Sequence, residues 1–171
     1  MQRSHASGQN RVILNTPLPF DCVIRKPNSG VARELLLLLH GFAESGERLF
    51  KKLEPALTDE LREHALVMAP NGPFPMPHRT ESGYRVTFSW YFYEPGADEY
   101  YIDMKPAIAF IQEGIRAHGA WDLPKRLIGF SQGGFLAPIL AAELPHVQQL
   151  IGLGCEYLVD EIPGELPGSV P

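Results

Sequence analysis

The stretch Arg126-Leu127-Ile128-Gly129-Phe130-Ser131-Gln132-Gly133-Gly134 decides the fold. Its first part, Arg126–Phe130, is a short apolar run that predicts a buried strand, and Gly133–Glu143 continues as a helix. Gly129 and Gly133 stand two residues to either side of Ser131, so the strand and the helix can approach without a collision of side chains. The pattern G-x-S-x-G therefore predicts a tight strand-to-helix turn with Ser131 at its apex.

An alternation of strands and helices extends outward from this turn. Glu34–Leu39 is a continuous apolar run, typical of a strand that is covered on both faces. The other expected elements are a strand at 20–25, two short helices within 46–63 with Pro55 in the first turn of the second, a strand at 66–70, a helix that starts after Asp103 and ends at Gly119, and a strand at 150–153. We therefore expect an α/β fold, a mostly parallel sheet with helices on both faces, as a single domain over residues 1–171.

Residues 71–98 show neither the residue spacing of an amphipathic helix nor the alternation of a strand. Pro73, Pro75 and Pro77 exclude a helix, and the segment is dense in aromatic residues, which argues against disorder. We expect an irregular aromatic loop with something apolar lying against it.

Composition narrows the classes of function. The chain has 44% hydrophobic and 20% charged residues, as in an ordinary globular protein, and its net charge of −5 argues against nucleic acid as a partner. Cys22 and Cys155 lack the spacing of a metal or redox site, and the histidines lack metal-ligand spacing, so we expect no metal and no cofactor. Residues 1–10 do not resemble a secretory signal, and the longest apolar run, Leu35–Leu39, is too short to cross a membrane. We expect a cytoplasmic protein.

The turn at Ser131 has the pattern and the context of a nucleophile elbow, which pushes a serine hydroxyl out at the carboxyl end of a strand. His40-Gly41-Phe42 ends the first long buried strand. Backbone N–H groups after such a strand, with the N–H after the nucleophile, can hold a developing oxyanion. Phe42 and Gln132 are the candidate donors, and we expect His40 to order the loop, with a role as catalytic base as the alternative.

Five segments together resemble a known family: Leu36–Gly41, Glu44–Gly46, Ala69–Pro73, Ser89–Tyr91 and Gly129–Gly134. In order and spacing they are similar to the phospholipase/carboxylesterase family, which includes the acyl-protein thioesterases. The resemblance implies an α/β-hydrolase fold and hydrolysis of small-molecule or lipid esters or thioesters through an acyl-enzyme on Ser131. It also implies an acyl pocket under residues 73–96, with Trp90 and Phe74 in its lining.

The acid and the base of a catalytic triad have no counterpart. A serine needs a histidine to take its proton and a carboxylate to orient that histidine, and in this fold both follow the serine in the chain. Only forty residues follow Ser131. His146 is expected far from the serine, Asp160 and Glu161 are ordinary loop carboxylates, and His78 is a surface histidine. We therefore expect a fold that lacks its last strands and last helix.

Three explanations remain open. The chain is incomplete, the hydrolase is degenerate, or a second subunit in a homodimer completes the exposed apolar edge at Leu150–Leu153. The first is the simplest. The competing functional hypothesis is a binding module, or an inert fragment, that kept the pocket and lost the chemistry.

Overall fold

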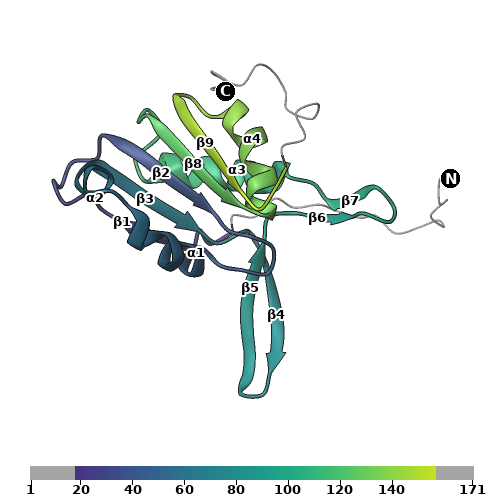
Figure 1. Cartoon of the computed structure of the whole chain (residues 1–171). Coiled ribbons are helices and arrows are strands. Elements are labelled where there is room, and N and C mark those ends of the chain that lie inside the picture. The colour runs from purple at the N-terminus through teal and green to yellow at the C-terminus, as the bar shows by residue number, and fades with distance from the viewer. Residues whose placement is uncertain (1–17, 157–171) are drawn as a thin grey trace.

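The computed structural model describes residues 18–156. A five-stranded sheet forms its centre, in the order β1-β3-β2-β8-β9 (Figure 1). The strands are β1 (Cys22–Arg25), β2 (Glu34–Leu39), β3 (Ala65–Pro70), β8 (Lys125–Phe130) and β9 (Val147–Leu153). Only β1 is antiparallel to its neighbour in this sheet, and the other three pairings are parallel. The prediction of a mostly parallel sheet is confirmed.

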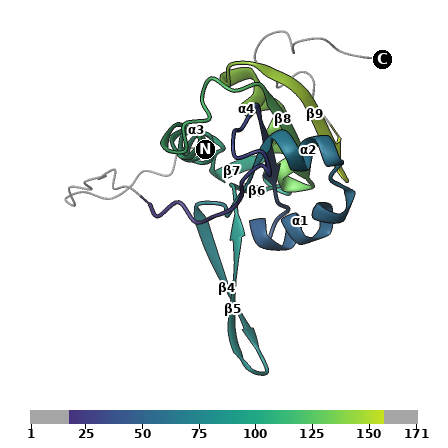
Figure 2. The ribbon, with the colours of Figure 1, turned by 90° about the vertical axis from the view of Figure 1, so that its left-hand side faces the viewer.

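Helices cover both faces of the sheet, as predicted (Figures 1 and 2). The apolar side chains of β2 alternate between two cores, because successive residues of a strand point to opposite faces. Leu36 and Leu38 pack with α1 (Gly46–Leu53) and α2 (Asp59–His64). Leu35, Leu37 and Leu39 pack with α3 (Lys105–Ala117) and α4 (Gln132–Glu143).

One helix boundary differs from the prediction. Pro55 lies in a 3₁₀ turn, Glu54–Ala56, between α1 and α2 and not in the first turn of α2. The second helix begins later because the Thr58 hydroxyl caps it, accepting a hydrogen bond from the Leu61 N–H at 3.3 Å.

The segment 71–98 is not the irregular loop that was predicted. It contains β4 (Phe74–Thr80) and β5 (Gly83–Ser89), which form an antiparallel hairpin that projects from the body (Figure 1). A second hairpin follows, from β6 (Phe92–Glu94) and β7 (Glu99–Ile102). Pro75 and Pro77 are compatible with β4 because alternate residues of an edge strand direct their backbone nitrogen away from the partner strand.

The amino end of β8 is held by a buried lysine. The Lys125 ammonium donates hydrogen bonds to the carbonyl oxygens of Trp121, Leu123 and Pro145 at 2.5, 2.8 and 2.9 Å. Lys125 is 0% exposed, and burial lowers the pKa of its ammonium group. Three carbonyls thus replace the water that a surface lysine would bind.

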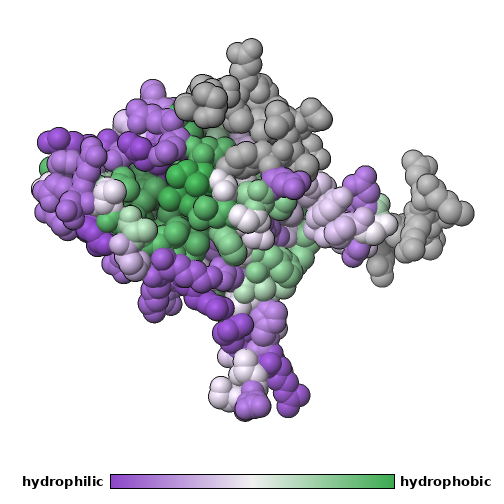
Figure 3. Space-filling model, in the orientation of Figure 1, coloured by the Kyte–Doolittle hydropathy of each residue, from purple (hydrophilic) through white to green (hydrophobic). Residues whose placement is uncertain are grey.

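In the described chain β9 lies at the end of the sheet, as expected for Leu150–Leu153. On the face that carries α1 and α2, Ile128 and Phe130 of β8 lie beside Ile151 and Leu153 of β9, which are 36% and 37% exposed. Figure 3 shows apolar surface gathered over the middle of the sheet on this side. This end of the sheet therefore presents apolar side chains to solvent.

Candidate active site

Ser131 connects β8 to α4 in a strained backbone conformation. Its φ of 49° and ψ of −115° lie in a region that side-chain-bearing residues rarely adopt. The turn is held on both sides: the Ser131 N–H donates to the Leu153 carbonyl at 2.8 Å, and the Ser131 carbonyl accepts from the Gly134 and Phe135 N–H groups. Such strain persists only where the surrounding structure determines it, as it does here.

Two glycines make this turn sterically feasible. A Cβ on Gly129 would lie 2.4 Å from the Gly133 carbonyl oxygen. A Cβ on Gly133 would lie 2.3 Å from the Leu39 carbonyl oxygen at the end of β2. The start of α4 therefore lies directly against the ends of two strands, and Ser131 is placed at the carboxyl edge of the sheet, where the loop after β2 also begins.

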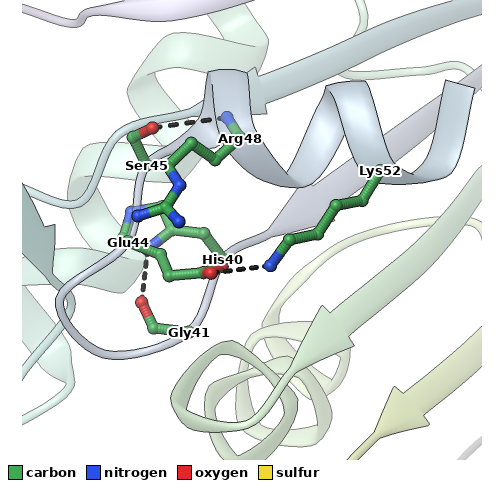
Figure 4. Close-up of polar contacts among 6 residues, drawn as sticks. All are labelled: His40, Gly41, Glu44, Ser45, Arg48 and Lys52. Atoms are coloured by element: carbon green, nitrogen blue, oxygen red, sulfur yellow. Dashed lines mark hydrogen bonds and ion pairs between the residues drawn. The ribbon is translucent and has the colours of Figure 1, made fainter.

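That loop is ordered by His40, which is 0% exposed. Its Nε2 accepts a hydrogen bond from the Gly72 N–H at 2.9 Å, which places the ring proton on Nδ1, 2.7 Å from the Gly41 carbonyl oxygen (Figure 4). Burial lowers the pKa of His40 to about 4. Both ring nitrogens are occupied and the ring is neutral, so His40 organises the loop and is not arranged as a base.

The rest of the loop is tied to α1 (Figure 4). Ser45 caps the helix by accepting a hydrogen bond from the Arg48 N–H at 3.3 Å, and the Glu44 carboxylate pairs with the Lys52 ammonium at 2.7 Å. Phe42, between these anchors, is 50% exposed. Among the backbone hydrogen bonds of the described turns and loops, none is donated by the Phe42 N–H. The Gln132 N–H opens α4 and belongs to the first helical turn, whose N–H groups have no carbonyl within the helix to bind.

A pocket of about 280 Å³ opens beside these groups and is lined by Phe42, Tyr91, Phe92, Tyr93 and Gln132. Four aromatic side chains and one amide give it an uncharged lining. Phe92 and Tyr93 belong to β6, so the second hairpin supplies part of the wall.

Of the two residues expected in the lining, neither is there. Trp90 is completely buried, and its indole N–H donates to the His40 carbonyl at 2.8 Å, so it cannot face an open pocket. Phe74 is not among the lining residues and makes an edge contact with one of them, Phe92, with 6.1 Å between ring centroids. The aromatic density of the segment was the right signal. Which rings face the pocket depends on the β6–β7 hairpin, which the sequence pattern did not reveal.

The other polar candidates lie away from Ser131 or outside the described residues. His146 precedes β9 and its carbonyl accepts from the Lys125 N–H, at the opposite end of β8 from the serine. His78 is in β4, paired with Arg85 of the projecting hairpin. Asp160 and Glu161 fall outside the described residues. Within residues 18–156, no hydrogen bond joins the Ser131 hydroxyl to a histidine, and no group of three or more potential metal ligands occurs.

The family of the chain follows from a match between a family model and the segment that contains most of the elements described above. The family model described as serine hydrolase (FSH1) matches residues 32–154, from the start of β2 to the end of β9. The chain belongs to the FSH1 serine hydrolase family. Its fold is the α/β-hydrolase fold, and the resemblance drawn from the five segments is confirmed.

This FSH1 family member is similar to several solved structures, of which three are compared with it as follows. Acyl-protein thioesterase 2 of Zea mays has a TM-score of 0.51 and 19% identity, over 77% of this chain and 60% of that one. Esterase PE8 has a TM-score of 0.45 and 23% identity, over 74% of this chain and 59% of that one. A phospholipase/carboxylesterase of Dyadobacter fermentans has a TM-score of 0.47 and 18% identity, over 89% of this chain and 70% of that one. The chain thus spans about three fifths of the length of the first two.

No curated protein matches this FSH1 family member. Among its described helices, none is long and apolar enough to span a membrane.

Proposed function

We propose that this FSH1 family member is a serine esterase or thioesterase whose nucleophile is Ser131. The observation that carries the proposal is the strained conformation of Ser131 between β8 and α4, directly before Gln132, which lines an uncharged pocket. A side-chain-bearing residue in this conformation costs free energy, and such a cost is typical of functional sites.

In the proposed reaction the Ser131 hydroxyl oxygen attacks the acyl carbonyl carbon. The carbonyl π electrons move to oxygen, and the Phe42 and Gln132 N–H groups stabilise the oxyanion. Collapse of the tetrahedral intermediate expels the alcohol or thiol and leaves an ester on Ser131, which water then hydrolyses. The serine proton passes to a base, which returns it to the leaving alcohol or thiol; His40 is not that base, because both of its ring nitrogens are already hydrogen-bonded.

The proposed substrate is an ester or thioester with an uncharged acyl part. The four aromatic rings of the pocket would bury apolar surface, and the lining offers no charged group to pair with a charged acyl chain. About 280 Å³ is near the lower end of the range for small-molecule sites, so short acyl groups should be preferred. We propose no nucleic acid partner, and a cytoplasmic location remains a prediction from sequence.

A fluorophosphonate tests the nucleophile, because it phosphonylates an activated serine and the adduct is visible in the intact mass. We expect one adduct, located on Ser131 by peptide mapping and absent from Ser131→Ala. Ser82→Ala, in the exposed turn between β4 and β5, is the matched control and should label like the wild type. An adduct that persists in Ser131→Ala would assign the nucleophile elsewhere. A folded protein that forms no adduct would favour the non-catalytic binding module.

A further inference from the structure

The side-chain amide of Gln132 is buried and fully hydrogen-bonded to one short segment. Its Oε1 accepts from the Trp90 N–H at 3.0 Å, and its Nε2 donates to the Tyr91 carbonyl at 2.8 Å and to the Ser89 hydroxyl at 3.1 Å. The Ser89 hydroxyl in turn donates to the Tyr91 carbonyl at 2.7 Å. One side chain at the start of α4 therefore binds three consecutive residues more than forty positions earlier in the chain.

An amide is the side chain suited to this contact. The Trp90 N–H requires an acceptor and the Tyr91 carbonyl requires a donor, and a side-chain amide presents both, on adjacent atoms in one plane. An apolar side chain of the same length would leave both backbone groups buried without a partner, which is costly. The contact therefore specifies glutamine more narrowly than packing alone would.

The segment bound by Gln132 is also attached to the loop after β2. The Trp90 indole N–H donates to the His40 carbonyl at 2.8 Å, and the His40 ring lies 4.7 Å from the indole ring, centroid to centroid. His40 also contacts the Gly41 carbonyl directly before Phe42. A continuous chain of hydrogen bonds thus runs from α4 through Ser89–Tyr91 to the loop that carries Phe42.

We infer that the Gln132 side chain is a positioning group that sets the separation of the two proposed oxyanion donors. One donor is the N–H of Gln132 itself and the other is the N–H of Phe42, and the Ser89–Tyr91 segment joins the elements on which they stand. Donors must lie within about 0.3 Å of the ideal distance to the developing oxyanion, so loosening this connection weakens the transition state more than the bound substrate. The same contact fixes Tyr91, which lines the pocket. The inference rests on the proposed function for its catalytic consequence only.

The first test is independent of catalysis. Amide hydrogen exchange is compared in the full-length protein and in Gln132→Met, which keeps length and volume but makes no such hydrogen bonds. We expect faster exchange at residues 40–44 and 89–93, with β2, β3 and β8 unchanged. Gln148→Met, at an exposed position of β9, is the matched control. Unchanged exchange at residues 40–44 would overturn the inference whether or not Ser131 is the nucleophile.

The second test uses hydrolysis of a short-chain p-nitrophenyl ester. Gln132→Met should lower kcat by about tenfold to a hundredfold, the loss expected from a misplacement approaching 1 Å, while KM changes by less than about threefold. Gln132→Glu tests the donor: a carboxylate repels the Tyr91 carbonyl, but a protonated carboxyl group donates to it. The ratio of Glu-variant to wild-type kcat should therefore rise as the pH falls.

A purely structural role predicts a different pattern. It would lower the amount of folded protein in both variants. The kcat per folded molecule would stay unchanged, and the ratio of Glu-variant to wild-type kcat would not depend on pH. That result would overturn the inference. If Gln132→Met does not fold, Trp90→Phe decides, since it keeps an aromatic ring in the core and removes the donor to the His40 carbonyl. It should accelerate exchange at residues 40–44 and lower kcat in the same way. An unaltered kcat and exchange in Trp90→Phe would refute the connection.

Discussion

Replacing Ser131 by glycine and by alanine measures the strain of the proposed nucleophile separately from its chemistry. Both substitutions remove the hydroxyl, so they differ only in the Cβ. At φ 49° and ψ −115° a Cβ costs about 1–3 kcal/mol of free energy, which glycine avoids. Glycine loses about 0.5–1 kcal/mol more conformational entropy on folding than alanine. The difference predicts that Ser131→Gly is at least as stable as Ser131→Ala, by up to about 2.5 kcal/mol.

The assay is urea unfolding of both variants, with the free energies compared at equal slopes. A control pair stands at Glu113, an exposed position in the middle of α3 with ordinary helical backbone. There the order should reverse, with Glu113→Gly less stable than Glu113→Ala by about 1 kcal/mol. The reasoning is refuted if glycine destabilises position 131 as much as position 113, because the backbone at Ser131 would then carry no strain.

Three further predictions follow from buried contacts. Gly133→Ala should destabilise the fold by about 1–3 kcal/mol in urea, because the new Cβ meets a β2 carbonyl at 2.3 Å, whereas Gly96→Ala meets only a flexible carboxylate and should change the stability by less than about 0.5 kcal/mol. The pKa of His40 is lowered from 6.5 to about 4, so its contribution of about 3 kcal/mol is complete above pH 6.5 and is lost as the pH falls towards 4. Unfolding of a His40→Gln variant at pH 7 and pH 5 should show a smaller loss than the wild type, and an equal loss would assign the acid sensitivity to other groups. Lys125→Met should cost about 3 kcal/mol by leaving three buried carbonyls without a donor, whereas Lys51→Met, at an exposed ion pair, should cost less than about 0.5 kcal/mol; equal costs would contradict the role given to the buried ammonium.

Much of the fold was predictable because its strands and helices carry local signals. The apolar run Glu34–Leu39 and the G-x-S-x-G turn are short patterns whose meaning depends on immediate neighbours. The buried stripe of α3, at Met104, Ile108, Ile111 and Ile115, also follows from its own spacing. The hairpins at 74–89 and 92–102 were missed because prolines and clustered aromatics obscure the period of two on which strand prediction depends.

The residues of the site also differ in whether the sequence alone could identify them. Ser131 and the loop at His40-Gly41-Phe42 could be singled out from sequence because each stands directly after a strand whose pattern is strong. The pocket lining could not, because Trp90 and its neighbours Tyr91 and Phe92 are chemically alike in sequence. Burial assigns Trp90 to the core, the β6–β7 hairpin places Phe92 in the wall, and the Gln132 amide holds Tyr91 there.

By itself the sequence determined the α/β alternation, the position of the strained turn and the glycines that allow it, because these depend on contacts between residues close in the chain. Only the tertiary structure decided that His40 is a neutral, doubly hydrogen-bonded ring, that Lys125 replaces water with three carbonyls, and that Gln132 binds the Ser89–Tyr91 segment. Each of these includes a contact between groups that are far apart in sequence: His40 with Gly72, Lys125 with Pro145, and Gln132 with Trp90. Their energies come from donor and acceptor geometry in a buried environment, and no local pattern of residue types contains that geometry.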